Sequence, residues 1–197
     1  MERMKRVRRK TWMWGILCIL VAAVLATGIA SASCATAEAA GTLLPKKLKM
    51  TCSSGAGAWG IYLTVKKNGK FSGEYEDSDM GEYGSGYDET VWHSEFTGTF
   101  KGIKKKDGFR YSMKVKDVEF KEKPGTRKIK NRVLYEAKNI SLKKGGTYTL
   151  YCPGTPVSKI PAEAWSWVTL SGQADAHAEV LAGYILYRKG EDPYYGK

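Results

Sequence analysis

The chain has 197 residues, and 32 lysines and arginines against 20 aspartates and glutamates give it a formal net charge of +12. Hydrophobic residues make up 43% of the chain and aromatic residues 12%, which excludes a disordered, collagen-like or coiled-coil protein. The length predicts one domain, alone or with a targeting segment. The sequence carries no strong catalytic or cofactor motif, so it predicts location and fold better than activity.

Residues 1–40 are typical of an export signal. Six basic side chains lie within residues 1–10, residues 11–37 carry no charge, and small residues follow; this is the order of regions in a signal peptide. We expect an N-terminal signal helix, cleavage near residues 37–40, and a secreted or cell-surface protein. The apolar stretch is also long enough for an uncleaved membrane anchor. Lipid attachment at Cys34 is a third alternative, but Ser31 occupies the position that needs a large aliphatic residue.

The remainder divides into a linker (residues 41–50), a single β domain (residues 51–190) and a loose tail (residues 191–197). After cleavage only Cys52 and Cys152 remain. An even pair of cysteines in an exported protein predicts a disulfide. Two unpaired, buried thiols are the alternative.

Period-two alternation of apolar and polar residues predicts strands rather than helices. Residues 59–65 alternate in this way, Asn68-Gly69 is typical of a type I′ hairpin turn, and residues 71–76 form the return strand. Further strands are expected at 91–103, 109–115, 133–135, 147–152 and 180–187, with a short helix at 161–167. We expect a mainly β fold, an antiparallel meander closing into a small lipocalin-like barrel. A two-sheet sandwich is the alternative.

Several stretches resemble a group of uncharacterised secreted proteins and lipoproteins of Gram-positive bacteria. The resemblance is carried by the SSGAG-x-W stretch at Ser53–Trp59, the DSDMG stretch within Gly69–Gly81, and the segments Phe96–Ile103, Phe109–Val115 and Leu150–Trp167. It covers most of the chain after the signal. The resemblance implies export and a β fold, and no particular reaction.

An acidic loop is the clearest local anomaly. Seven acids fall in 16 residues with no lysine or arginine among them: Glu74, Glu76, Asp77, Asp79, Glu82, Asp88 and Glu89. Ca²⁺ prefers several oxygen ligands from a flexible loop, so Asp77, Asp79 and Glu82 are candidate Ca²⁺ ligands, although the EF-hand spacing is absent. A solvated loop that pairs with the basic half of the chain is the alternative. No other cofactor is expected.

The two histidines define a second candidate metal site. Asp175, His177 and Glu179 would share one face of a strand, and His93 would complete a set of two histidines and a carboxylate. The alternative is an exposed, polar strand end.

Residues 101–147 hold sixteen lysines and arginines against five acids. Such a field attracts polyanions, and for an exported protein these are an anionic membrane or a cell-wall polymer rather than nucleic acid. Lys104, Lys105 and Lys106 are the candidate contacts; solubilising charge is the alternative.

The predicted function is therefore a non-enzymatic, exported or cell-surface barrel that binds a ligand. A barrel mouth lined by aromatic residues would suit a small apolar or carbohydrate ligand. One alternative is an envelope-acting hydrolase or metal-dependent enzyme that uses the acidic loop at residues 74–89. Another is a purely structural or interaction domain.

Overall fold

The computed structural model describes residues 44–57, 59–79, 81 and 84–197. The chain divides into two units at residues 41 and 42, and the description below concerns the second unit, residues 42–197. The predicted signal segment, its alternatives and Glu82 lie outside the described residues.

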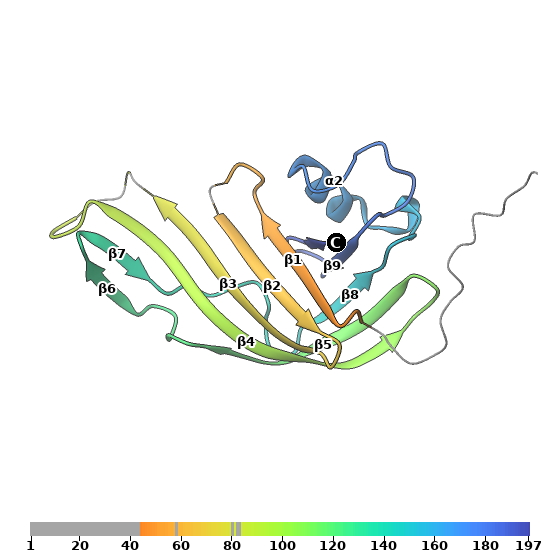
Figure 1. Cartoon of the computed structure of the whole chain (residues 1–197), viewed down its shortest axis with the longest axis horizontal. Coiled ribbons are helices and arrows are strands. Elements are labelled where there is room, and N and C mark those ends of the chain that lie inside the picture. The colour runs from red at the N-terminus through yellow and green to blue at the C-terminus, as the bar shows by residue number, and fades with distance from the viewer. Residues whose placement is uncertain (1–43, 58, 80, 82–83) are drawn as a thin grey trace, which may run out of the picture. The chain divides into compact units, whose positions relative to one another are not determined.

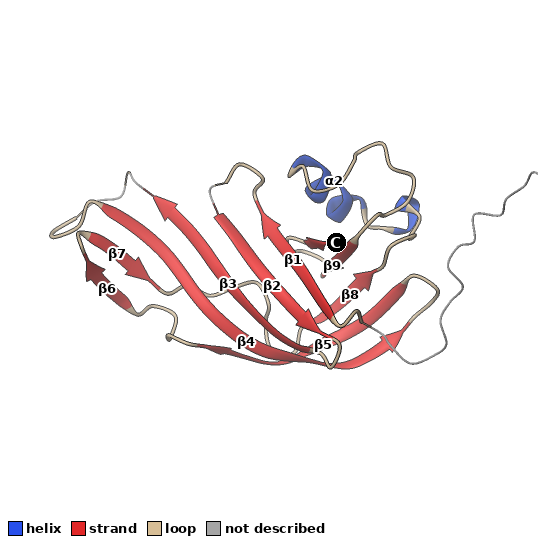
Figure 2. Cartoon of the chain, viewed as in Figure 1, coloured by secondary structure: helices blue, strands red, loops and turns tan. Residues whose placement is uncertain are grey.

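The second unit is built mainly from strands (Figures 1 and 2). In chain order the elements are β1 (Lys47–Ser53), β2 (Trp59–Lys66), β3 (Lys70–Asp79), β4 (Glu89–Lys105), β5 (Arg110–Phe120), β6 (Arg127–Lys130), β7 (Val133–Glu136), β8 (Thr147–Tyr151), the 3₁₀ turn η1 (Val157–Lys159), α2 (Ala162–Leu170), β9 (Tyr184–Tyr187) and β10 (Tyr194–Gly196).

Eight of these strands close into an antiparallel barrel. Their order is β3-β2-β1-β10-β9-β8-β5-β4, and β4 pairs again with β3, so the ring has no free edge. The predicted mainly β, barrel fold is confirmed, and the sandwich alternative is wrong. Because β4 is 17 residues long, its N-terminal part extends beyond β5 and pairs in parallel with β7. β6 pairs with β7 outside the ring.

The interior of the barrel is filled by side chains from the strand positions that face inward. In β2, Ile61, Leu63 and Val65 are buried, while Tyr62 between them is exposed. The chain reverses at Asn68-Gly69 as predicted, but the turn is not type I′, which needs a positive φ at both residues. Only Gly69 has one, at 81°, and its N–H donates to the Lys66 carbonyl over 2.8 Å. The rings of Phe71 and Phe100 pack against each other inside the barrel at a tilt of 46°, with centroids 4.8 Å apart. This alternation is the physical basis of the predicted barrel.

Both predicted ends of the β domain need correction. Residues 47–50, assigned to a linker, belong to β1, where Leu48 and Met50 are buried. Residues 191–197, assigned to a loose tail, contain β10, which lies between β1 and β9. Tyr194 on β10 is 1% exposed. Both segments bury core side chains, so they are parts of the barrel rather than its flanks.

A second, smaller core lies outside the barrel. Ala164 and Val168 of α2 pack against Tyr151, Ile185 and neighbouring residues of β8 and β9. The helix follows Pro161 as predicted, but it runs to Leu170, and the last predicted strand begins only at Tyr184. The intervening residues 171–183 form turns and irregular segments.

Candidate functional site

The two cysteines of the barrel are free thiols, so the predicted disulfide between Cys52 and Cys152 is wrong. Cys52 lies on β1 and Cys152 directly follows β8; strands β10 and β9 separate them in the ring. Neighbouring strands are about 4.8 Å apart, and a disulfide needs Cα atoms within ~7 Å. Burial raises the pKa of Cys52 to about 12, with a smaller contribution from Asp192.

Asp77 and Asp79 of the predicted Ca²⁺ site have local partners. The Tyr75 hydroxyl donates to Asp77 Oδ2 over 3.0 Å, and the Gly81 N–H donates to Asp79 Oδ1 over 2.7 Å. Burial and the bond to Asp77 raise the pKa of Tyr75 to about 12. Since Glu82 lies outside the described residues, the predicted Ca²⁺ site stays a prediction.

The predicted grouping of Asp175, His177 and Glu179 on a strand face is wrong, because these residues lie in a turn region between α2 and β9. Asp175 Oδ1 accepts a hydrogen bond from the backbone N–H of His177 over 2.9 Å. His177 is exposed. His93 has a different set of neighbours.

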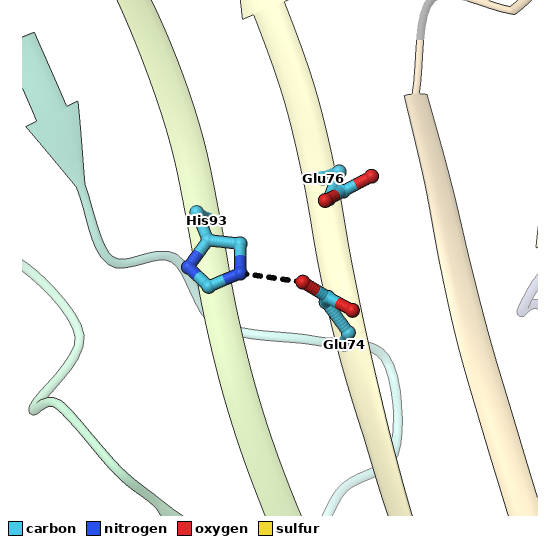
Figure 3. A group of neighbouring side chains, drawn as sticks. All are labelled: Glu74, Glu76 and His93. Atoms are coloured by element: carbon cyan, nitrogen blue, oxygen red, sulfur yellow. Dashed lines mark hydrogen bonds and ion pairs between the residues drawn. The ribbon is translucent and has the colours of Figure 1, made fainter.

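His93 lies beside two carboxylates on the outer wall of the barrel (Figure 3). Glu74 and Glu76 are two residues apart on β3, so both point outward, and Glu76 is the direct register partner of His93 on β4. His93 Nε2 lies 2.7 Å from Glu74 Oε1. One ligand atom from each of the three residues lies within 4.8 Å of the others.

A groove of about 640 Å³ runs across the outer face of β2 to β5, next to this cluster. Its polar lining comes from four adjacent strands and from Lys121, which directly follows β5. The strand residues are Tyr62, Thr64, Ser72, Glu74, Glu95, Thr97 and Glu119. A second groove of about 390 Å³ lies between β4 and the β6–β7 ribbon, and His93 and Glu95 line it. Glu74 therefore borders the first groove and His93 the second.

Lysines gather where four segments of the chain meet at one end of the barrel. The segments are the start of β1, the β2–β3 turn, the middle of the β4–β5 hairpin and the turn before β8. Backbone hydrogen bonds join them, from Lys67 to Lys46, from Phe100 to Gly69 and from Val115 to Gly146. We call this region, with its extension along the β4–β5 hairpin, the lysine end. Its twelve exposed lysines are Lys46, Lys47, Lys66, Lys67, Lys70, Lys101, Lys104, Lys105, Lys106, Lys114, Lys143 and Lys144.

Among the described residues, none of these twelve lysines forms an ion pair with an acid. The basic side chains far from the lysine end are often paired instead. Arg132 binds Asp88, Lys121 binds Glu95 and Arg127 binds Glu136. The unpaired positive charge of the barrel is thus concentrated at one end.

No protein-family model, curated protein or solved structure matches the chain. Within the described part of the chain, no helix combines the length and the apolarity that crossing a bilayer requires. The fold and the sites together define a closed antiparallel β-barrel with a filled interior and its polar sites on the outside.

Sequence reasoning located the acids and the lysines but missed how they group. The alternation within residues 71–76 places Glu74 and Glu76 on one face, so the outward pair was visible in the sequence. The register between β3 and β4 brings His93 to them, and that register depends on a connection whose geometry no local pattern specifies.

Proposed function

We propose that this chain is a non-enzymatic, exported binding module that docks its lysine end on an anionic phospholipid membrane. The observation that carries the proposal is the set of twelve unpaired lysines gathered from separate segments. Unpaired lysines near an anionic membrane each contribute about 1 kcal/mol of attraction. The interior is filled, so the proposal does not use a ligand inside the barrel.

The course of the chain favours a membrane over a soluble polymer. The backbone enters the barrel at Lys47, at the lysine end, and the apolar stretch of residues 12–30 precedes it in the sequence. If that stretch is retained as an anchor, it tethers the barrel by its basic end. If it is cleaved, the same lysines remain for reversible, salt-sensitive adhesion.

Vesicle co-sedimentation of residues 42–197 tests the proposal, because this unit has its own core and lacks the apolar stretch. Vesicles of phosphatidylcholine with about 30% phosphatidylglycerol should bind the protein at about 0.01 M salt, where the Debye length is ~30 Å, and release most of it by about 0.15 M. Pure phosphatidylcholine vesicles should not bind it. Equal binding to both vesicles would contradict the proposal.

Two triple variants locate the contact. Replacing Lys66, Lys67 and Lys70 with glutamine removes three charges from the β2–β3 turn, and at about 1 kcal/mol per lysine it should weaken binding about a hundredfold. Replacing Lys104, Lys105 and Lys106 with glutamine should also weaken binding to the anionic vesicles.

The matched control replaces Lys123, Lys128 and Lys130 with glutamine. It removes the same net charge near β6, which Figure 1 shows at the opposite end of the barrel unit from the β4–β5 turn. This variant should keep most of the binding. If the control loses as much binding as the two variants, net charge alone explains the binding and the lysine end is not the contact surface. If the protein binds soluble polyphosphate but not the anionic vesicles, its partner is an anionic polymer and not a membrane.

A further inference from the structure

The outer wall of β3 and β4 carries a cluster with the composition of a metal site. Glu74 reaches from β3 towards His93 on β4, and Glu76 lies further along β3 (Figure 3). One ligand atom from each residue lies within 4.8 Å of the other two. We infer that these three side chains bind a divalent transition-metal ion such as Zn²⁺. The site is on the barrel wall and does not depend on membrane docking.

The set of ligand atoms selects the class of metal. Ca²⁺ takes six to eight oxygen ligands, whereas this cluster offers one imidazole nitrogen and two carboxylates. Imidazole suits Zn²⁺, Cu²⁺, Ni²⁺ and Fe²⁺. Three protein ligands leave a fourth tetrahedral position open. The grooves beside Glu74 and His93 give that position access to water or to an exogenous ligand.

The distances require only small rotations of side chains. Zn²⁺ lies about 2.0–2.1 Å from nitrogen and oxygen ligands, so two ligands of a tetrahedral ion are ~3.3 Å apart. His93 Nε2 and Glu74 Oε1 are 2.7 Å apart and need to separate slightly. The Glu76 carboxylate needs to move closer to both of them. The side chains of His93 and Glu74 are 35% and 44% exposed, and Glu76 is exposed, so none is locked by packing.

The contact between His93 and Glu74 is a hydrogen bond that a metal ion can replace. Nε2 and Oε1 already face each other across this contact, so a cation bound by both atoms would take the place of the hydrogen bond. Glu76 has no hydrogen-bond or ion-pair partner among the described residues, which leaves its carboxylate available. Lys121, which lines both grooves, is already held by Glu95 at 2.7 Å.

Titration of the full chain in detergent with Zn²⁺ tests the inference. We expect one Zn²⁺ per chain by isothermal titration calorimetry, and a visible d–d spectrum when Co²⁺ is the probe. His93→Gln and Glu76→Gln should each weaken Zn²⁺ binding at least about tenfold. Glu76 is exposed, so Glu76→Gln should leave the circular dichroism spectrum unchanged and separates loss of the site from loss of the fold.

The second histidine provides the matched control. The chain has only two histidines, and His177 lies in an exposed turn, so His177→Gln should bind Zn²⁺ like the parent. Zn²⁺ should also protect His93, and not His177, from diethyl pyrocarbonate. The inference is wrong if the parent binds no stoichiometric Zn²⁺, if His177→Gln loses binding as His93→Gln does, or if Ca²⁺ displaces Zn²⁺ at equal concentration.

Discussion

The Ser94 hydroxyl forms hydrogen bonds with both backbone polar groups of Lys138, although 44 residues separate the two in the chain. The Ser94 hydroxyl donates to the Lys138 carbonyl over 2.7 Å and accepts from the Lys138 N–H over 2.8 Å. Ser94 is 3% exposed. The pair fixes the connection from β7 to β8, which brings Ile140 and Leu142 into the barrel core.

Ser94→Ala should therefore destabilise the barrel. The substitution leaves the N–H and C=O of Lys138 without their partner, and an unsatisfied buried polar group costs about 1–3 kcal/mol. We expect a loss of about 2 kcal/mol in the free energy of unfolding, measured by urea denaturation. Ser78→Ala, at an exposed position of β3, is the control and should change the free energy of unfolding by less than about 0.5 kcal/mol.

The hairpin of β2 and β3 was predictable because two independent signals agree there. The alternation of residues 61–65 sets the buried face, and Asn68-Gly69 marks where the chain reverses. The register was not predictable, because a type I′ turn there would pair Val65 with Ser72, whereas the structure pairs Val65 with Phe71. β1 also alternates, with buried Leu48 and Met50 on either side of Lys49, but the lysines favoured a tether. β10 has three residues, too few for any period to be visible. Its place depends on pairing with β9 and with β1, which lies at the other end of the barrel's sequence.

The candidate metal site was only half predictable for the same reason. The outward pair of Glu74 and Glu76 follows from local alternation, whereas His93 joins them through a ladder between β3 and β4. A shift of one residue in that ladder would turn a side chain to the other face of the sheet. The disulfide prediction failed similarly, because counting cysteines says nothing of how many strands lie between Cys52 and Cys152.

The two barrel thiols should be slow to alkylate in the folded protein and fast in the unfolded one. Burial raises the pKa of Cys152 to about 11, and nearby Lys105 opposes this only in part; burial raises that of Cys52 to about 12. The thiolate is the reactive form, so little of either exists near pH 8. Iodoacetamide should label both cysteines when the protein is unfolded in guanidinium. Over the same time it should label neither in the folded protein, and peptide mapping detects the difference. A Cys52–Cys152 cross-linked peptide in an unreduced digest would contradict this prediction.

The same shifts make the barrel less stable at alkaline pH. In the unfolded chain a cysteine ionises near pH 8.5 and a tyrosine near pH 10, whereas burial holds the pKa of Cys52 and Tyr75 at about 12 in the fold. Above about pH 8.5 the unfolded state binds fewer protons, so the free energy of unfolding falls as pH rises.

Each such group contributes a slope of up to about 1.4 kcal/mol per pH unit between its two pKa values. Urea denaturation from pH 8 to pH 11 should show the decline, and Cys52→Ala should make it shallower. Ser78→Ala, which removes no ionisable group from an exposed position of β3, should leave the slope unchanged. A free energy of unfolding that is constant over this range would contradict the prediction.

The last five residues should be essential for the barrel, although they had been assigned to a tail. Deleting residues 193–197 removes β10, and β1 and β9 then become open edges in place of a closed wall. Tyr194 is also lost, and truncating a large buried aromatic side chain costs about 3–5 kcal/mol. We expect the truncated protein to lose its cooperative thermal transition in circular dichroism. Tyr194→Ala should lower the free energy of unfolding by a similar amount with the backbone intact, whereas removal of the exposed Lys197 alone should have no effect. A cooperative, unchanged transition in the five-residue deletion would show that the ring closes without β10.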